Sequence, residues 1–320
     1  MSFVESRVYC RSVGIPLLAG TAIASCCWIT TLHATEGGGN NYPVGVNTLL
    51  SGIQPPPGNH IYVYLQEYEA TTLEGNNGNR SSSVSNFSLH AQAAAFRLSH
   101  VWRDVTFLGA TLETRTNIPF VSLDLHFDAH TPKGTVYKSG SVTGLSDLTV
   151  GPLFLGWHLG NLHQVLGLEF FLPTGSYDTN RLVNPGRHYY SMQPNYAVTW
   201  MPVPSLEFSA RALYSVNSVN HVTDYHSGNE FIVDYNAGFR FSPMWQIGAS
   251  GYFYKQVTDD TQHGQSVNGN GNRGQAFAVG PAIAYGTRKF SVALKYQREL
   301  IVRNRPEGNR IWLQMYVPFQ

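Results

Sequence analysis

The spacing of its turns constrains this chain more than any other feature. From Ser146 onward, short and long links alternate between stretches of alternating apolar and polar residues. The short links are Gly160-Asn161-Leu162, Pro202-Val203-Pro204, Ser242-Pro243 and Gly286-Thr287-Arg288, and the long ones cover 174–187, 217–230, 258–274 and 300–309. A soluble sandwich has no reason to place every long link on one side, whereas a transmembrane barrel has short periplasmic turns and long outer loops. The rhythm predicts an antiparallel up-and-down β-barrel in a bacterial outer membrane.

The composition agrees with a protein that has a lipid-facing exterior. Charged residues make up 13% of the chain, against roughly 25% in ordinary soluble domains. Aromatic residues also make up 13%, as interfacial girdles require. The mean hydropathy is only −0.17, which fits a polar interior behind an apolar outer face. The net charge of +1 gives no reason to expect a nucleic-acid partner.

The first 34 residues resemble a secretory signal peptide. Arg7 and Arg11 precede a largely apolar stretch over 13–29, and a cleavage site follows at Ala34. All three cysteines lie in this segment, so the mature chain is expected to have no disulfide, thiolate metal site or cysteine nucleophile. A lipoprotein-type site at Cys26 is the competing interpretation.

Five stretches alternate apolar and polar side chains with the period of two that a strand requires. They cover 121–128, 193–200, 206–215, 231–240 and 289–297. In a pore-type barrel the apolar set faces lipid and the polar set faces the lumen. This rule predicts lumen-facing positions for Asp124, His126, Glu207, Arg211, Asp234, Arg240 and Lys295. Buried charges must pair or face water, so these groups either narrow a pore and orient a solute, or only stiffen a closed barrel.

The same pattern predicts twelve strands in a barrel domain over 60–320. They are expected near 60–70, 86–100, 106–127, 146–159, 163–173, 188–200, 206–217, 231–241, 245–256, 275–286, 289–300 and 310–319. The even number puts both termini in the periplasm. The third strand is longer than one crossing needs, so it either protrudes outward or breaks near Asn117-Ile118-Pro119. The last ends in Phe319, the kind of terminal aromatic that barrel-assembly machinery reads.

Residues 35–59 precede the barrel and combine turn-forming runs with short apolar islands. This segment is expected either to plug the lumen from the periplasmic side or to be a flexible lead-in. The inward side of 275–286 carries only Ala and Gly, which would let a plug approach closely.

Several local motifs occur in the order found in one known family. They are Thr35-Glu36-Gly37-Gly38-Gly39, Leu145–Pro152, Leu172–Tyr177, Asn184-Pro185-Gly186-Arg187, Thr223–Gly228, Asn272-Arg273-Gly274 and Asn304-Arg305-Pro306-Glu307-Gly308. With these motifs the chain resembles the MetA-pathway phenol-degradation family of outer-membrane proteins. The resemblance implies a transporter-like barrel linked to the uptake of aromatic or other hydrophobic compounds. Loop geometry alone also explains many of the motifs, because Asn, Gly and Pro build turns.

Catalytic and metal-binding patterns are weak. Gly248-Ala249-Ser250-Gly251 lies within an expected strand rather than at a strand-to-helix turn. His126, Asp128 and His130 share a strand face but lack further named ligands, and the Asp259-Asp260 loop lacks the calcium-motif spacing. We therefore expect no catalytic, cofactor or metal residues and no enzyme activity.

These patterns favour a passive outer-membrane channel for small hydrophobic or aromatic solutes, in contact with outer-membrane lipid. A lipid-modifying barrel enzyme and a structural or adhesive barrel with partner-binding loops are the alternatives.

Overall fold

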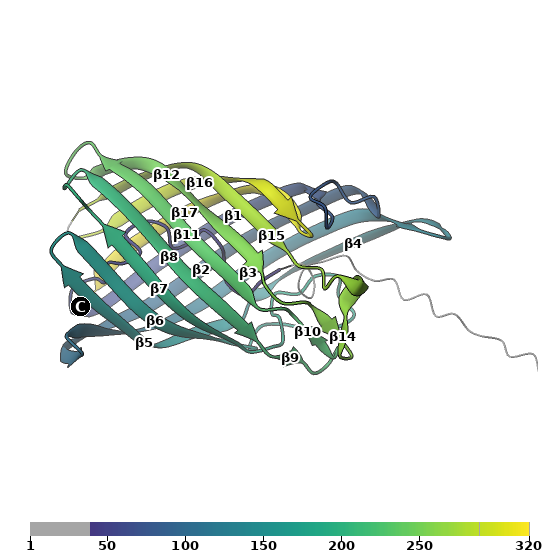
Figure 1. Ribbon diagram of the computed structural model, residues 1–320, viewed down its shortest axis with the longest axis horizontal. Coiled ribbons are helices and arrows are strands. Elements are labelled where there is room, and N and C mark those ends of the chain that lie inside the picture. The colour runs from purple at the N-terminus through teal and green to yellow at the C-terminus, as the bar shows by residue number, and fades with distance from the viewer. Residues whose placement is uncertain (1–38, 288, 320) are drawn as a thin grey trace, which may run out of the picture. The chain divides into compact units, whose positions relative to one another are not determined.

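A closed barrel of twelve strands forms the body of the protein (Figure 1). The structure is a computed structural model that describes residues 39–287 and 289–319. The expected signal peptide over 1–34, Cys26 and the start of the 35–59 segment lie outside the described residues. Among the described residues, no helix is long and apolar enough to cross a membrane.

The barrel strands follow one another around the wall in chain order. They are β1 (Gly58–Leu73), β2 (Val84–Phe107), β3 (Ala110–Thr131), β5 (Leu148–Leu159), β6 (Leu162–Leu172), β7 (Ser191–Trp200), β8 (Leu206–Asn217), β11 (Glu230–Arg240), β12 (Trp245–Gln256), β15 (Gln275–Gly286), β16 (Ser291–Arg303) and β17 (Pro306–Phe319). Each pairs antiparallel with the next, and β1 pairs with β17 from Asn59↔Phe319 to Leu73↔Pro306, which closes the barrel. The predicted fold class and number of strands are confirmed.

Short secondary elements decorate the links. β4 (Gly134–Leu145) pairs with β3. β9 (Val219–Asn220), β10 (Tyr225–His226), β13 (Thr261–Gln262) and β14 (Gln265–Ser266) form a small sheet between two long loops, next to a 3-10 turn at Val267–Gly269. The pairings within this small sheet tie the two long loops to each other.

The two ends of the barrel differ, and we name them the turn end and the loop end. Links 108–109, 160–161, 201–205 and 241–244 lie at the turn end, where β15 ends, β16 and β1 begin, and β17 finishes. Links 74–83, 132–133, 173–190, 218–229 and 257–274 lie at the loop end. The long loop expected over 300–309 is wrong, because β16 and β17 continue until only Asn304 and Arg305 separate them. Asn304 makes this tight turn with a φ of 51°.

Side chains alternate across the barrel wall as a strand dictates. On β8, Glu207, Ser209 and Arg211 are buried inside while Phe208 is exposed. Large apolar residues likewise cover the outer faces of β11 and β16. At the turn end, Trp245 and Tyr285 lie 4.8 Å apart between ring centres, as in an interfacial aromatic girdle.

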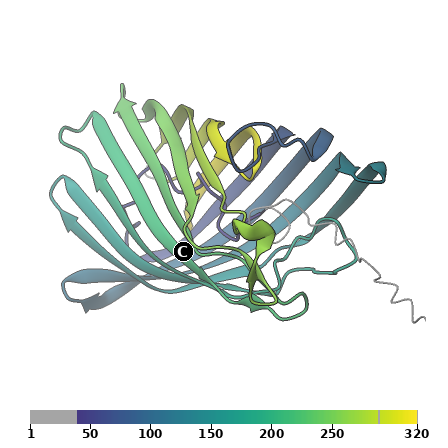
Figure 2. The same ribbon diagram turned by 45° about the vertical axis from the view of Figure 1, so that its right-hand side comes forward.

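β2, β3 and β4 extend past the neighbouring strands at the loop end (Figures 1 and 2). β3 pairs with β5 over 111–117 and then with β4 from Phe120↔Leu145 to Thr131↔Gly134. The long third strand therefore protrudes, and it is continuous through Pro119. β4 was not predicted, although Pro132-Lys133-Gly134 is a clear turn signal.

The protruding part of β3 corrects one prediction. Asp124 and His126 do not face the lumen: their side chains are 58% and 42% exposed. Leu125 and Phe127 occupy the inner face instead, in a buried cluster with Tyr68. The physical reason is that this part of β3 has polar surroundings outside and an apolar cluster inside, so the polar-inward rule for membrane-embedded strands does not apply.

Candidate functional site

Residues 39–57 run through the inside of the barrel and form the most informative feature of its interior (Figure 1). We call them the lumen segment. Tyr42, Val44 and Val46 are buried against Ala276 and Ala278 of β15 in one apolar cluster. The small side chains of β15 leave the space that the lumen segment fills.

At Gly52 the lumen segment lies flat against the backbone of the wall. A Cβ on Gly52 would fall 2.4 Å from the backbone nitrogen of Thr199 and 2.6 Å from the carbonyl oxygen of His163. The Gly52 N–H donates to the Thr199 hydroxyl at 3.0 Å. Since neither wall backbone group can give way cheaply, this contact requires glycine.

Two wall residues of opposite charge, Asp234 and Lys295, form hydrogen bonds with the lumen segment. Asp234 of β11 accepts hydrogen bonds from the Tyr42 hydroxyl at 2.7 Å, the Gly45 N–H at 2.7 Å and the Asn47 N–H at 3.0 Å. Lys295 of β16 donates to the carbonyl oxygens of Gly45 at 2.9 Å and Val46 at 2.7 Å. Both side chains are fully buried, so the segment satisfies charges that would otherwise be costly inside the barrel.

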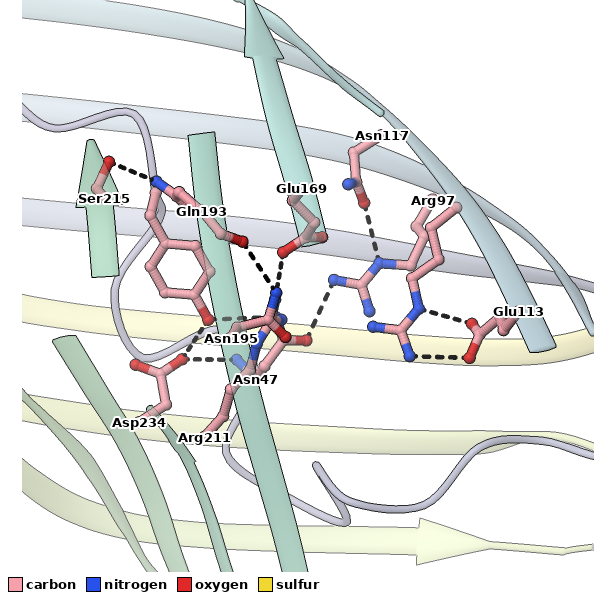
Figure 3. Close-up of polar contacts among 12 residues, drawn as sticks. Asn47, Arg97, Glu113, Asn117, Glu169, Gln193, Asn195, Arg211, Ser215 and Asp234 are labelled. Carbon is pink, nitrogen blue, oxygen red and sulfur yellow. Dashed lines mark hydrogen bonds and ion pairs between the residues drawn. The ribbon is translucent and has the colours of Figure 1, made fainter. Parts of the chain in front are cut away.

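Ion pairs and amides continue this polar network across the lumen (Figure 3). Arg211 pairs with Glu169, and Arg115 pairs with Glu113 at 2.6 Å. Arg97 of β2 donates to the side-chain oxygens of Asn117 at 2.9 Å and of Asn47 at 3.1 Å. The lumen segment, through Asn47, thus links β2 and β3 on one side of the barrel to β11 on the other.

Four of the seven predicted lumen-facing residues are buried inside: Glu207, Arg211, Asp234 and Lys295. Glu207 accepts from the Leu50 N–H at 2.8 Å and the Gln246 amide at 2.5 Å. Arg240 is half-buried near the turn end of β11 and donates to the Gln246 side chain at 3.3 Å. Asp124 and His126 lie outside, as described above.

A cavity of about 260 Å³ lies between the lumen segment and the β1–β3 wall. Its apolar side includes Leu89, Val121, Leu123 and Leu125, and its polar side includes the arginines Arg97, Arg187, Arg305 and Arg310 together with Glu169 and Asp147. Burial raises the pKa of Asp147 at the loop end, although it accepts backbone hydrogen bonds from Gly175 at 2.9 Å and Arg187 at 2.8 Å. The cavity is therefore amphipathic.

The face of β3 changes character along its length, and this builds the apolar side of the cavity. Glu113, Arg115 and Asn117 share the inner face with Val121 and Leu123 further along the strand. On the outer face, Phe120 is 45% exposed before polar residues follow. Apolar and polar residues therefore change faces near Pro119, and this change marks the point where β3 leaves the apolar outer belt of the barrel.

Sequence reasoning missed several buried charges: Arg97, Glu113, Glu169, Glu230, Glu299, Arg305 and Arg310. For Glu299 and Arg97, the alternation could have been extended along β16 and β2 to place the side chain inside. Arg305 offers no such signal, because it lies in the unpredicted two-residue turn before β17.

Among the described residues, one group has metal-ligand geometry. Glu67, Glu69 and His90 on β1 and β2 place their ligand atoms within 4.8 Å of one another. The carboxylates of the Asp259-Asp260 loop bind protein side chains: Asp259 accepts from Arg273 at 2.6 Å and Asp260 from the Tyr225 hydroxyl at 2.6 Å. Hydrogen bonds from Ser266 and Arg273 lower the pKa of Asp259. His130 contacts Ser85 at 2.8 Å.

One solved structure shares the fold of this barrel, and two other outer-membrane proteins match it less well. An outer membrane channel from Pseudomonas putida F1 is 18% identical, with a TM-score of 0.70 over 83% of this chain and 97% of that chain. The translocator domain of the autotransporter NalP from Neisseria meningitidis is 8% identical, with a TM-score of 0.47 over 83% and 90% of the two chains. A Pseudomonas aeruginosa FadL homologue is 8% identical, with a TM-score of 0.40 over 82% and 90%. The first of these establishes the fold of an outer-membrane barrel.

Sequence comparison with curated proteins finds no match. The model of one protein family, described as "Putative MetA-pathway of phenol degradation", matches residues 72–315. That range covers the barrel from the end of β1 to within β17, so the resemblance seen in the sequence motifs is confirmed. The chain belongs to the MetA-pathway phenol-degradation family.

Proposed function

We propose that this protein is an outer-membrane channel for the passive uptake of small hydrophobic or aromatic compounds. The turn end and both termini face the periplasm, and the loop end faces outward. The lumen segment acts as a plug that keeps the channel closed to ions. Passage of a solute through the channel needs no cofactor.

The amphipathic cavity is the observation that carries this proposal. An apolar wall of Leu89, Leu123 and Leu125 borders a space inside the barrel, where an ordinary aqueous pore would carry polar side chains. Such a surface favours hydrophobic solutes because it removes their apolar area from water. The membership in a phenol-degradation family and the similarity in fold to the outer membrane channel from Pseudomonas putida F1 also support an uptake channel for hydrophobic or aromatic compounds.

The contacts of Asp234 make the plug testable by conductance in planar bilayers. Removing the carboxylate in Asp234→Ala leaves the Tyr42 hydroxyl and two N–H groups of the lumen segment without their acceptor. We expect more frequent openings for this variant, and a continuously larger conductance for a protein lacking 39–57. Asp124→Ala, which removes an exposed carboxylate, is the matched control and should behave as the unaltered protein.

Influx of labelled phenol into cells that express the protein tests the cargo. Expression should raise the influx relative to cells carrying an empty vector, because the outer leaflet of lipopolysaccharide resists apolar solutes. Unchanged conductance on removal of 39–57 would exclude the plug. Unchanged phenol influx would exclude phenol as cargo, and absence of both conductance and influx in every variant would exclude the channel.

A further inference from the structure

Three buried arginines of the cavity lie against aromatic rings, and their hydrogen bonds go to neutral oxygens. Arg97 donates to Asn117 and Asn47, Arg305 to the side chain of Asn40 at 3.2 Å, and Arg310 to the carbonyl oxygen of Val44 at 3.1 Å. The Arg305 guanidinium lies 4.1 Å from the ring centre of Tyr254, Arg310 lies 4.6 Å from Tyr68, and Arg97 lies 4.9 Å from Tyr64. Each arginine is only 7% exposed. Within the described part of the chain, none of the three has a carboxylate oxygen within 4.0 Å.

The nearby carboxylates accept hydrogen bonds from tyrosine hydroxyls. Glu299 accepts from the hydroxyls of Tyr68 and Tyr252, and Glu230 accepts from the hydroxyl of Tyr254 at 2.8 Å. The rings of Tyr68, Tyr252 and Tyr254 thus each have an arginine on the face and a glutamate at the hydroxyl. Cation–π contact stabilises a guanidinium but leaves its N–H groups available for hydrogen bonds.

The unpartnered buried polar atoms that line the cavity are all able to donate. Over the described residues they are the Tyr64 hydroxyl, Nε and Nη1 of Arg305, Nε of Arg310 and Nε1 of Trp312. A buried donor without an acceptor costs free energy. Among the buried lining side chains of the described residues, no atom that can only accept lacks a partner. The unmet need is therefore for a hydrogen-bond acceptor, and beside these arginines a negatively charged one is favoured.

We propose that this cavity binds a monocarboxylate with an apolar or aromatic body. The carboxylate accepts hydrogen bonds from Arg305 and Arg310, for which a guanidinium fork is well suited. The body lies along Leu89, Leu123 and Leu125 on the opposite side. Glu169 and Asp147 also line the cavity, which disfavours a head group of higher negative charge. This inference rests on the proposed uptake function and names its substrate class.

Calorimetric titration of the full chain in detergent, with two probes of equal size, separates the contribution of the carboxylate head group to the affinity from that of the apolar body. The probes are 4-phenylbutyrate and its neutral analogue 4-phenylbutanamide. We expect the carboxylate to bind at least about tenfold more tightly at pH 7, as charge-assisted hydrogen bonds predict. Arg305→Gln and Arg310→Gln should each remove about tenfold of the carboxylate affinity and leave that of the amide unchanged.

Arg103→Gln is the matched control, because Arg103 is exposed on β2. If a glutamine variant fails to fold, Arg305→Lys keeps the positive charge but removes the guanidinium fork, and it should still weaken carboxylate binding several-fold. Equal affinity for acid and amide, equal loss of both in the arginine variants, or no binding of either probe would overturn the inference. The conductance change on removal of 39–57 does not depend on these titrations, so the channel can stand while this inference fails.

Discussion

At the scale of single residues, the stability of the barrel interior depends on buried charges that are paired with an opposite charge. Arg211 and Glu169 are each about 2% exposed and form an ion pair. Removing one partner of such a pair leaves an uncompensated buried charge, whereas removing both can be almost neutral. The energetic consequence is an asymmetry between single and double substitutions.

Glu169→Gln should therefore destabilise the barrel by about 3–5 kcal/mol. The double variant Glu169→Gln/Arg211→Met should recover much of that loss, because the unpaired guanidinium is gone. Urea unfolding from phospholipid vesicles measures both free energies. Glu307→Gln breaks the more exposed Arg298–Glu307 pair at 2.6 Å and should cost less than about 1 kcal/mol. A single variant as stable as the unaltered protein would show that the pair contributes nothing.

At the scale of elements, β3 decides the character of the cavity's apolar side, and β4 pairs with the part of β3 that provides it. β3 belongs to the barrel wall only up to its pairing with β5 at Asn117, and its later residues pair with β4. Leu125 and Phe127 reach the inside only because the strand continues beyond the wall. The protruding hairpin is therefore expected to support ligand binding without being needed for closure.

Replacing 121–144 by Asn-Gly tests this division. Phe120 and Leu145 are direct cross-strand partners, so a two-residue turn can join them. The protein should still show the heat-dependent gel mobility of a folded barrel, but its affinity for 4-phenylbutyrate should fall by about tenfold or more, because the apolar wall is lost.

The matched control shortens the same hairpin at its tip. Replacing 129–136 by Asn-Gly joins the partners Asp128 and Tyr137 and keeps the residues that line the cavity. Ligand affinity should be unchanged in this control. If both shortened proteins bind equally well, the hairpin does not form the binding wall.

At the scale of the whole molecule, the barrel has two unlike ends and one closed wall. Every strand that forms the wall pairs on both sides, so no free edge remains in the apolar belt. Among the described residues, every link of ten residues or more lies at the loop end, and barrels of the bacterial outer membrane keep their long loops outside. The proposed orientation follows from that asymmetry.

Cysteine labelling on intact cells tests the orientation, because all three natural cysteines lie within the predicted signal peptide. Val222→Cys is at the loop end and Val203→Cys at the turn end, and the valines are 58% and 46% exposed. A membrane-impermeant maleimide should label the first in intact cells and the second only after the outer membrane is permeabilised. The reverse result would invert the proposed topology.

The sequence by itself determined the barrel: its period of two, its turns and its number of strands are local properties of the chain. The inner positions of Glu207, Arg211, Asp234 and Lys295 followed from the same alternation. An alternating pattern shows that two faces differ, but it does not say which face is inside once a strand leaves the membrane. Asp124 and His126 were misplaced for that reason.

Only the tertiary structure decided what fills and lines the interior. Whether 39–57 enters the barrel depends on partners such as Asp234 and Lys295, which are distant in sequence. The cavity likewise joins arginines of β2, β17 and the β16–β17 turn to the apolar face of β3. The hydrogen-bond partners of buried charges and donors are set by which residues the closed barrel brings close together. A local sequence pattern does not contain that information, because these partners are distant along the chain.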